Sequence, residues 1–479
     1  MKHPYVLFAS SAELPEWWQA FRRLSVEEKL LPLLWQLAII VLVARMFAVV
    51  FRRFGQPGVV GEIVAGLVLG PSVLGRFAPN VFQAVFHPGT PGVPAEVFDA
   101  FLGWGITALS EVGLILLLFL IGLEFEFHHL RRQGRAALSI SLAGIALPFA
   151  LGFGLGRLMH PHVAAAVPPL AFALFCGTAL SITAIPVLGR IMMEMNITRT
   201  RLGTVTLTAA ALDDATGWIL LAAVAAVARS QLDPVRILLM AAATLGFVLL
   251  LFLVRPLLRR GARLALRAGR GDLGVNGLAL LFVVMFACAV ATNYIGVFAV
   301  FGPFCLGVVL SDEHEFRAAA GRRLRDVVSA FFLPIFFAYT GLRTDLNSLT
   351  SWQTWALCGL VILAGVVGKL GGCGLAARLS GLSLRESACV GALMNTRGLM
   401  SLIVINLGKD LGVLPDSVYG MMILMALVTT GMTSPLLLRL MPGTELELYI
   451  RNSAFLSRYH SPVKASADSA LSASHQLHA

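Results

Sequence analysis

Charged residues are scarce in this sequence. Asp, Glu, Lys and Arg make up 13% of the 479 residues, whereas hydrophobic residues make up 57%. A soluble protein usually carries about 25% charged residues. The mean hydropathy of +0.82 is likewise unusually high. A water-soluble domain of this length cannot bury so much apolar surface, so the composition excludes that class and predicts that lipid surrounds much of the chain.

Cysteine is also scarce, and no two of the six cysteines form a C-x-x-C pair. All six lie inside apolar segments, which argues against a disulfide framework and against a zinc site. A secretory signal is missing as well, since the apolar run from Tyr5 to Ala9 is too short for one. Residues 1–32, where Trp17 and Trp18 stand among charged residues, instead predict an extracytoplasmic segment at the membrane interface.

The formal net charge of +11 does not indicate a nucleic-acid partner. Arg and Lys lie between the apolar runs rather than on one contiguous face, so membrane topology explains them better. The sequence offers no reason to expect a cofactor.

Thirteen runs come near the length that crosses a bilayer, which is about 17–25 apolar residues. The loops that follow the odd-numbered runs carry most of the arginines, so the positive-inside rule places the amino terminus outside and the carboxyl terminus in the cytoplasm. We therefore expect an all-α, multi-pass protein of the bacterial inner membrane. The runs are 33–51, 58–75, 104–124, 136–158, 168–192, 202–228, 235–257, 275–292, 297–312, 325–342, 353–379, 385–408 and 416–439.

Two pairs of segments resemble each other at an offset of seven runs. LLLFLIGLEFEF (116–127) resembles LPIFFAYTGLRTDL (333–346), and GVVGEIVAGLVLGPS (58–72) resembles GVFAVFGPFCLGVVLSDE (296–313). Because seven is odd, the two copies enter the membrane from opposite sides. This is the pattern of inverted-topology repeats in alternating-access transporters.

The repeat divides the chain into expected domains. The transmembrane domain covers 33–440, with a first repeat at 33–228, a linker helix at 235–257 and a second repeat at 275–440. Residues 441–479 are expected to form a cytoplasmic, disordered tail that is rich in Ser and Ala.

The same offset pairs the fifth run with the twelfth, and both contain residues that interrupt a helix. The fifth holds CGTALSITAIPVLG (176–189) and the twelfth holds GALMNTRGLMSL (391–402). We predict two broken, crossing helices that flank a binding site, although a kinked but intact helix would fit each run taken alone. The side chains expected to act as ligands at these breaks are Thr178, Ser181, Thr183, Asn395 and Thr396.

Ionisable residues inside the runs point to the site itself, because each costs at least about 2.5–3.5 kcal/mol at mid-bilayer. Asp213 and Asp214 lie in the middle of the sixth run. Adjacent helix positions differ by about 100°, so the two carboxylates cannot share one face. Lys369 is the expected charge partner of Asp213, and Arg397 lies at the twelfth run's break, where it can neutralise a helix end.

These oxygen ligands suit a cation such as Na⁺ or K⁺. We predict that Asp214 binds either the cation or a proton, and that Asp213, the second ion ligand, pairs with Lys369 when the cation is absent. Glu62 is expected to support the site through a broken helix or a Gly-rich backbone. A buried salt-bridge network with only a packing role is the structural alternative.

Five stretches, in this order, resemble the monovalent cation:proton antiporter-2 family of sodium/hydrogen exchangers. The last one also resembles the plant cation/proton exchangers and their bacterial relatives. The stretches are GQPGVVGEIVAGLVLGPSVLG (55–75), LILLLFLIGLEFEF (114–127), TALSITAIPVLGRI (178–191), AALDDATGWILLA (210–222) and LMNTRGLMSLIVINLG (393–408).

The resemblance implies the sodium/proton antiporter fold, with a dimerisation domain, a mobile core made of the fourth to sixth and eleventh to thirteenth runs, and a homodimer. It implies that Asp213 and Asp214 are the family's ion-binding pair and Lys369 its lysine partner. The potassium-efflux members carry a nucleotide-binding domain, for which there is no room after Leu440. The protein is not expected to be an enzyme.

The expected function is therefore secondary active exchange of Na⁺ or K⁺ for protons, which compete for a buried aspartate. Two aspartates with a lysine resemble the electrogenic members, whereas the plant-like stretches indicate electroneutral potassium exchange, and the sequence leaves both open. A channel or proton-independent carrier is one alternative. An intramembrane aspartyl protease would need carboxylates on facing helices, and a membrane sensor would not depend on the buried acids.

Overall fold

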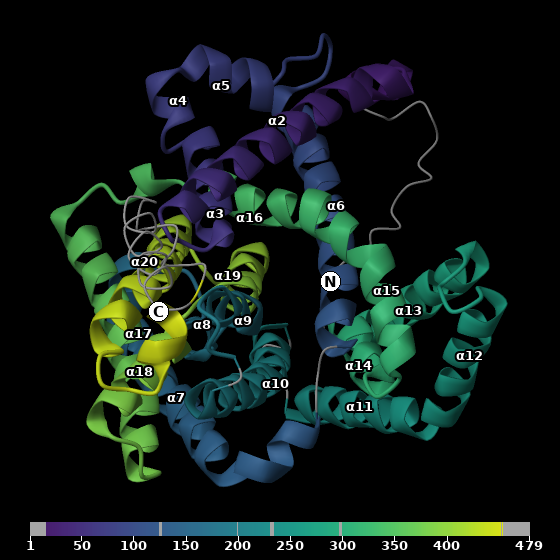
Figure 1. The fold of residues 1–479 in the computed structure, drawn as a ribbon. Coiled ribbons are helices and arrows are strands. Elements are labelled where there is room, and N and C mark those ends of the chain that lie inside the picture. Colours follow the sequence, from purple (N-terminus) through teal and green to yellow (C-terminus); the bar gives the residue numbers. More distant parts are fainter. Residues whose placement is uncertain are drawn as a thin grey trace, which may run out of the picture.

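The computed structural model describes residues 16–123, 127–198, 200–229, 234–296, 299–451 and 453, which form helices joined by turns and loops (Figure 1). A short π-helical segment, Val328–Phe332, joins α15 to α16. In chain order the α-helices are α1 (Glu16–Arg23), α2 (Val26–Arg53), α3 (Gly58–Leu69), α4 (Leu74–Phe77), α5 (Pro79–Phe86), α6 (Ala95–Leu123), α7 (Phe127–Val163), α8 (Pro169–Ser181), α9 (Ile185–Glu194), α10 (Arg201–Arg229), α11 (Pro234–Leu253), α12 (Arg255–Ala268), α13 (Val275–Ile295), α14 (Phe301–Leu310), α15 (His314–Val327), α16 (Leu333–Leu342), α17 (Trp352–Leu379), α18 (Leu384–Met394), α19 (Leu399–Asp410), α20 (Asp416–Leu440) and α21 (Leu446–Arg451).

Each of the thirteen apolar runs coincides with a helix or a pair of helices. Within the described residues, eight helices are long and apolar enough to cross a membrane, and the pair α11–α12, bent by 52°, raises the number to nine. The short α14 and the two interrupted helices fall below this length. Helix length by itself therefore supports eight or nine crossings rather than thirteen.

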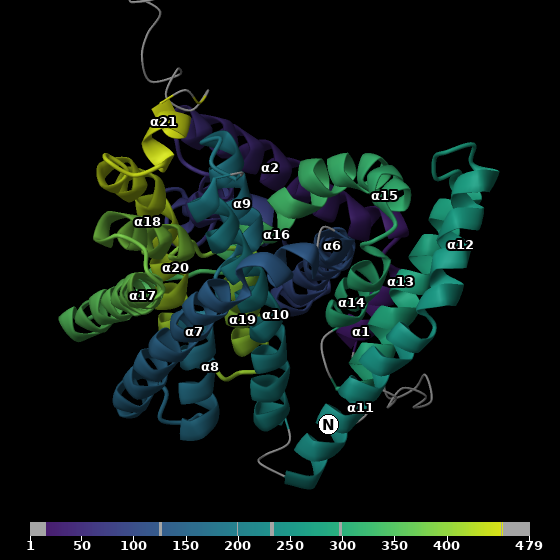
Figure 2. The same cartoon turned by 60° about the horizontal axis from the view of Figure 1, so that its bottom comes forward.

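The helices form two groups by their packing, and the members of each can be followed in Figures 1 and 2. We call α7–α10 with α17–α20 the core group; within it α7 packs on α8, α10 and α17, and α20 packs on α17, α18 and α19. We call α2, α3, α6 and α11–α16 the scaffold group; within it α3 packs on α2 and α16, and α14 packs on α6 and α13. The core group consists of the six runs that the family resemblance assigns to a mobile core.

Glycines bring the scaffold helices into backbone contact, and they do so twice with the same spacing. A Cβ atom on any of four glycines would lie 1.9–2.6 Å from a backbone oxygen of the facing helix, so a larger residue would force the helices apart. In α3, Gly61 faces α2 and Gly66 faces α16; in α14, Gly302 faces α13 and Gly307 faces α6. The facing helices α2 and α13 are themselves seven runs apart, as are α6 and α16.

The ends of the membrane domain differ in part from the sequence prediction. A capping box formed by Ser25 and Glu28, with the Ser25 hydroxyl accepting from the Glu28 N–H, starts α2 seven residues before position 33. The predicted tail needs a correction at its beginning. Leu446 and Ile450 lie four residues apart on α21 and are buried against the core group, because this spacing puts both side chains on one face. Residues 454–479 lie outside the described part of the chain.

Candidate functional site

Both predicted interruptions are present in the core group. Residues 182–184 separate α8 from α9, and residues 395–398 separate α18 from α19. The two breaks lie against each other, since the N–H of Ala184 donates to the carbonyl oxygen of Thr396 at 3.2 Å. Each break thus supplies a partner for a backbone group that the other leaves without a helical bond.

Asp213 of α10 accepts a hydrogen bond from the backbone of the first break. Its carboxylate oxygen Oδ2 accepts from the backbone N–H of Thr183 at 2.7 Å and from Lys369 Nζ of α17 at 2.9 Å. The Asp213 and Lys369 side chains are both fully buried. Three segments of the core group therefore meet at one carboxylate oxygen, which carries a charge-assisted bond to each of the other two.

Asp214, the next residue, lies in a different environment. Its exposed fraction is 3%, and its oxygen Oδ1 is buried with no hydrogen-bond partner among the described residues. The step of about 100° between adjacent helix positions explains how one aspartate reaches Lys369 while the other does not. Each carboxylate therefore keeps one buried oxygen, Oδ1, that no described donor reaches, and the two differ in that only Asp213 is paired with a buried cation.

Arg397 supplies a second buried cation at the crossing. Its Nη1 donates to the carbonyl oxygen of Ile182, the C-cap residue of α8, at 2.6 Å. The guanidinium therefore lies at the negative end of the α8 dipole, whereas the sequence suggested a half-helix end at the break of the twelfth run. The hydroxyl of Ser401 donates to the same carbonyl at 3.0 Å.

The remaining predicted ligands lie at the breaks but use their polar hydrogens elsewhere. The hydroxyls of Thr178, Ser181 and Thr396 each donate to a carbonyl three or four residues earlier in the chain. The Thr183 hydroxyl donates across to α18. The Asn395 amide lies 3.5 Å from a carbonyl of α20, and its oxygen Oδ1 is buried with no donor in the described structure. Oxygen lone pairs, rather than hydrogens, are what these side chains can still offer.

Glu62 lies on α3 in the scaffold group and not on either broken helix. Its Oε1 is 3.8 Å from Nη1 of Arg45 on α2, and its side chain is 8% exposed. The support that Glu62 was expected to give to the breaks stays a prediction.

Sequence reasoning did not single out the hydroxyls of α20 that hold the second break. Thr430 Oγ1 accepts from the Arg397 N–H at 2.9 Å and donates to the Arg397 carbonyl at 2.6 Å. Thr429 supplies the carbonyl next to Asn395. A signal was available, because two adjacent threonines in the middle of an apolar run need partners for their hydroxyls.

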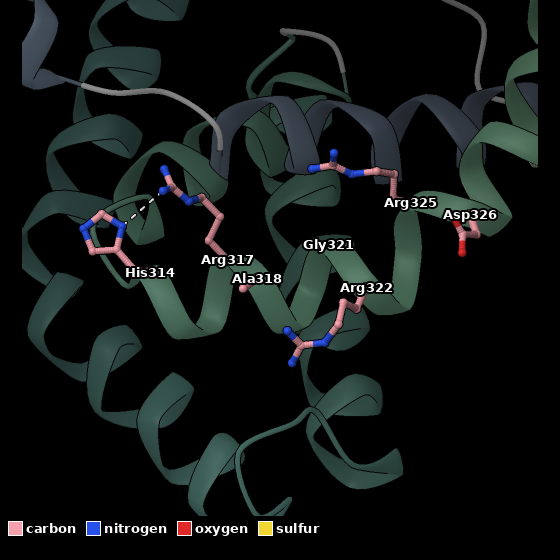
Figure 3. Close-up of a pocket in the computed structure, with 7 residues that line it drawn as sticks. All are labelled: His314, Arg317, Ala318, Gly321, Arg322, Arg325 and Asp326. Carbon is pink, nitrogen blue, oxygen red and sulfur yellow. Dashed lines mark hydrogen bonds between the residues drawn. The ribbon is translucent and has the colours of Figure 1, made fainter. Parts of the chain in front are cut away.

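One open cleft, of about 800 Å³, lies along a single face of α15 in the scaffold group (Figure 3). The cleft is separate from Asp213 and Asp214, which belong to the core group. The described residues include no cluster of three or more His, Cys, Asp or Glu side chains that would hold a metal ion. The cleft is lined by His314, Arg317, Ala318, Gly321, Arg322, Arg325 and Asp326.

Comparison with known proteins adds to this geometry. The family model described as "Sodium/hydrogen exchanger, transmembrane" matches residues 38–439. The chain is 39% identical to Cation/H(+) antiporter 17 of Arabidopsis thaliana, over 88% of this chain and 50% of that protein. It is 38% identical to the Na(+)/H(+) antiporter NhaS4 of Synechocystis sp., over 86% of this chain and 98% of that protein. The chain thus spans about half the length of the plant relative and nearly all of the cyanobacterial one.

A more distant relative and a solved structure complete the comparison. The chain is 30% identical to K(+)/H(+) antiporter 1 of Saccharomyces cerevisiae, over 84% of this chain and 46% of that protein. The sodium proton antiporter MjNhaP1 of Methanocaldococcus jannaschii superposes with a TM-score of 0.59 at 13% identity, covering 89% of this chain and 100% of that one. At this identity the superposition shows a shared fold and nothing more specific.

Proposed function

The chain belongs to the sodium/hydrogen exchanger family, and from that premise we propose that it is a membrane antiporter that exchanges a monovalent cation for protons. The relatives' names include a cation/H⁺, a Na⁺/H⁺ and a K⁺/H⁺ antiporter. The exchange is secondary active and works by alternating access. Na⁺ and K⁺ both remain candidate substrates, and no cofactor or catalysed reaction is part of the proposal.

One observation carries the mechanism, namely that Asp214 is buried with an oxygen Oδ1 that no described donor reaches, while the buried Lys369 pairs with its neighbour Asp213. An ionised carboxylate held away from water without a partner costs several kcal/mol. Asp214 therefore needs either a proton or a cation. Since one carboxylate cannot hold both, the two ions compete for it, and competition at a site that faces each side in turn couples their fluxes.

Because Asp213 is already paired with Lys369, we propose that the proton and the cation compete at Asp214. Lys369 and the Thr183 N–H already satisfy the Asp213 oxygen that they share. A cation that approaches Oδ2 of Asp213 must displace Lys369, and one at Oδ1 adds a second positive charge beside the lysine, whereas a cation at Asp214 displaces only a proton. We therefore propose Asp214 as the primary site of exchange and Asp213 as a second ion ligand when Lys369 withdraws.

Neutral oxygens for the cation come from the broken helices. Asn395 Oδ1 is buried without a donor, and the hydroxyl oxygens of Thr178, Ser181, Thr183 and Thr396 keep free lone pairs. Na⁺ and K⁺ are bound by hard oxygen ligands of this kind. Arg397 keeps the end of α8 neutral while the cation and the proton exchange places.

The architecture we propose follows the sequence prediction. Thirteen crossings would form two inverted repeats, 33–228 and 275–440, joined by the linker helix 235–257, with the amino terminus outside and the carboxyl terminus in the cytoplasm. The matching glycine contacts of α3 and α14 support the repeats, because equivalent residues approach equivalent helices. We also propose that the core group moves against the scaffold group and that the protein forms a homodimer.

Transport in everted membrane vesicles tests the function. The expected result is that Na⁺ or K⁺ collapses a preformed pH gradient in vesicles that contain the protein, and that Asp214→Asn abolishes this exchange. Asp272→Asn, which changes a partly exposed loop aspartate of the scaffold group that pairs with Arg323, is the matched control and should exchange normally. Coupled exchange by the Asp214→Asn protein at the rate of the unchanged protein would refute the assignment of the shared site.

A further inference from the structure

The apolar contacts between the core group and the scaffold group are concentrated in one half of the protein's thickness. One apolar cluster joins α8, α19 and α20 of the core group to buried scaffold residues, among them Ile63, Leu118 and Phe337. A second cluster surrounds α9, the start of α10 and α18. Among the described residues, its buried members come only from the core group and α21, and Val59 is the one scaffold side chain packed against it. The two groups are thus sealed together in one half and nearly separate in the other.

By the expected topology, the sealed half is the extracytoplasmic one. There α16 of the scaffold group is also tied to the core group by polar contacts. Asn406 Nδ2 of α19 donates to Thr340 Oγ1 of α16 at 2.9 Å. The hydroxyl of Tyr419, from α20, lies 2.7 Å from Asn406 Oδ1 and 3.0 Å from the Thr340 carbonyl oxygen, so its single proton serves one of these acceptors at a time. Thr340 and Tyr419 are fully buried, which shields these bonds from water.

One turn nearer the surface, charged contacts join the same helices. Arg343, which caps α16, donates through Nη2 to Asp410 Oδ1 at 2.5 Å. Lys409 Nζ donates to the Arg343 carbonyl oxygen at 2.9 Å and lies 4.4 Å from the centre of the Tyr419 ring. The two bonds of Arg343 therefore join the scaffold group to the core group. The contact between Lys409 and the Tyr419 ring lies within the core group and holds the lysine in place.

We propose that Thr340 and Arg343 on one side, with Asn406, Asp410 and Tyr419 on the other, form a latch that holds the extracytoplasmic route closed. The inference rests on the proposed exchange, because a latch matters only if the core group moves. The latch residues do not touch the ion. They act as positioning residues that set how long the site faces the cytoplasm, and their contacts must part once in every transport cycle.

A reversible cross-link tests whether the contacts must part. Thr340→Cys and Asn406→Cys are combined in protein whose six native cysteines are replaced, and a short bifunctional thiol reagent with a reducible bridge joins them. Exchange is expected to stop after linking and to return on reduction, whereas the same treatment leaves each single-cysteine protein active. Undiminished exchange by the linked protein would overturn the latch. Absence of exchange from the unchanged protein would instead count against the proposed function.

A charge exchange gives a second and independent test. Arg343→Asp and Asp410→Arg each break the half-exposed ion pair, and the double variant restores it in the opposite sense. Each single variant is expected to lower the KM for the cation on the extracytoplasmic side and to raise it on the cytoplasmic side, by up to about fivefold. The double variant should return both values toward those of the unchanged protein. Equal shifts on both sides, or no shift, would show a merely structural pair.

Discussion

Replacing Lys369 by Met removes the cation that holds Asp213, and the structure sets the size of the effect. The side chains of both residues are 0% exposed, and the ammonium nitrogen lies 2.9 Å from the carboxylate oxygen. Breaking such a pair by removing one partner typically costs about 3–5 kcal/mol, because the other charge stays buried. The N–H of Thr183 still donates to Asp213, so we expect the lower part of that range.

The double variant Asp213→Asn with Lys369→Met should be nearly as stable as the unchanged protein. Both charges are then gone, the Asn oxygen still accepts from Thr183, and replacing a buried pair by uncharged side chains is often neutral or stabilising. The strong non-additivity of the two single changes is the signature of a closed, buried pair.

Thermal unfolding of the purified protein in lipid measures this. At about 2.1 cal/mol/K per residue over roughly 400 residues, a loss of 3–5 kcal/mol lowers the Tm by about 4–6 °C. Arg451→Met is the control, since its pair with Glu447 is largely exposed and is worth about 0.5 kcal/mol or less.

The pH adds a check with a definite sign. In Lys369→Met the buried Asp213 carboxylate can lose its charge only by binding a proton. The folded variant therefore binds this proton more readily than the unfolded chain does. The stability of this variant relative to the unchanged protein should therefore rise as the pH falls, by up to about 1.4 kcal/mol per pH unit. A Lys369→Met protein as stable as its parent at pH 8, or additive effects of the two changes, would show that water reaches the pair.

Three further expectations concern the scaffold and the surface. Gly66→Ala places a Cβ 1.9 Å from the Ala338 carbonyl oxygen and should lower stability by about 1–3 kcal/mol, whereas Gly246→Ala, which meets open space, should be neutral or slightly stabilising in the same thermal assay. Ser383→Ala removes the capping box of α18 and should cost about 1 kcal/mol, seen as a lower Tm. The Arg263 guanidinium holds the pKa of Glu313 below its usual range. The contact between α12 and Glu313 should therefore persist at neutral pH and be lost only as the pH falls through that lowered pKa. Glu313→Gln removes the charge and should make α12 sensitive to trypsin already at pH 7.

Much of the site could be predicted because it breaks local rules that the rest of the chain obeys. An apolar run that contains Asp213 and Asp214, or one that contains Asn395 and Arg397, does not fit a plain membrane helix. The carboxylates of α10 and the interruption of α18–α19 are therefore visible in the sequence itself, and the Gly- and Pro-containing stretch 176–189 marks the interruption of α8–α9 in the same way. The pairing of Asp213 with Lys369 followed from charge, since only a few cations lie deep within the runs.

What the sequence did not reveal depends on how the helices cross. Arg397 was expected to neutralise a half-helix end, and it does so at Ile182, more than 200 residues away, because the two breaks lie side by side. The roles of Ser401 and Thr430 follow from the same crossing. The helical start of the predicted tail was missed because a two-residue apolar pattern such as Leu446 and Ile450 is too short to distinguish from chance.

The arrangement of the four buried charges also bears on stoichiometry. With Asp213, Lys369 and Arg397 charged, the site carries one net positive charge whether Asp214 holds a proton or a monovalent cation. Exchange at Asp214 alone thus replaces one proton by one cation and moves no net charge between the two states. A second proton enters only if the cation also takes Asp213 and Lys369 leaves as the neutral amine. On this proposal, whether the 2.9 Å contact between Lys369 and Asp213 persists during transport decides between an electroneutral and an electrogenic mode of exchange. A membrane potential should drive exchange in the second mode and not in the first.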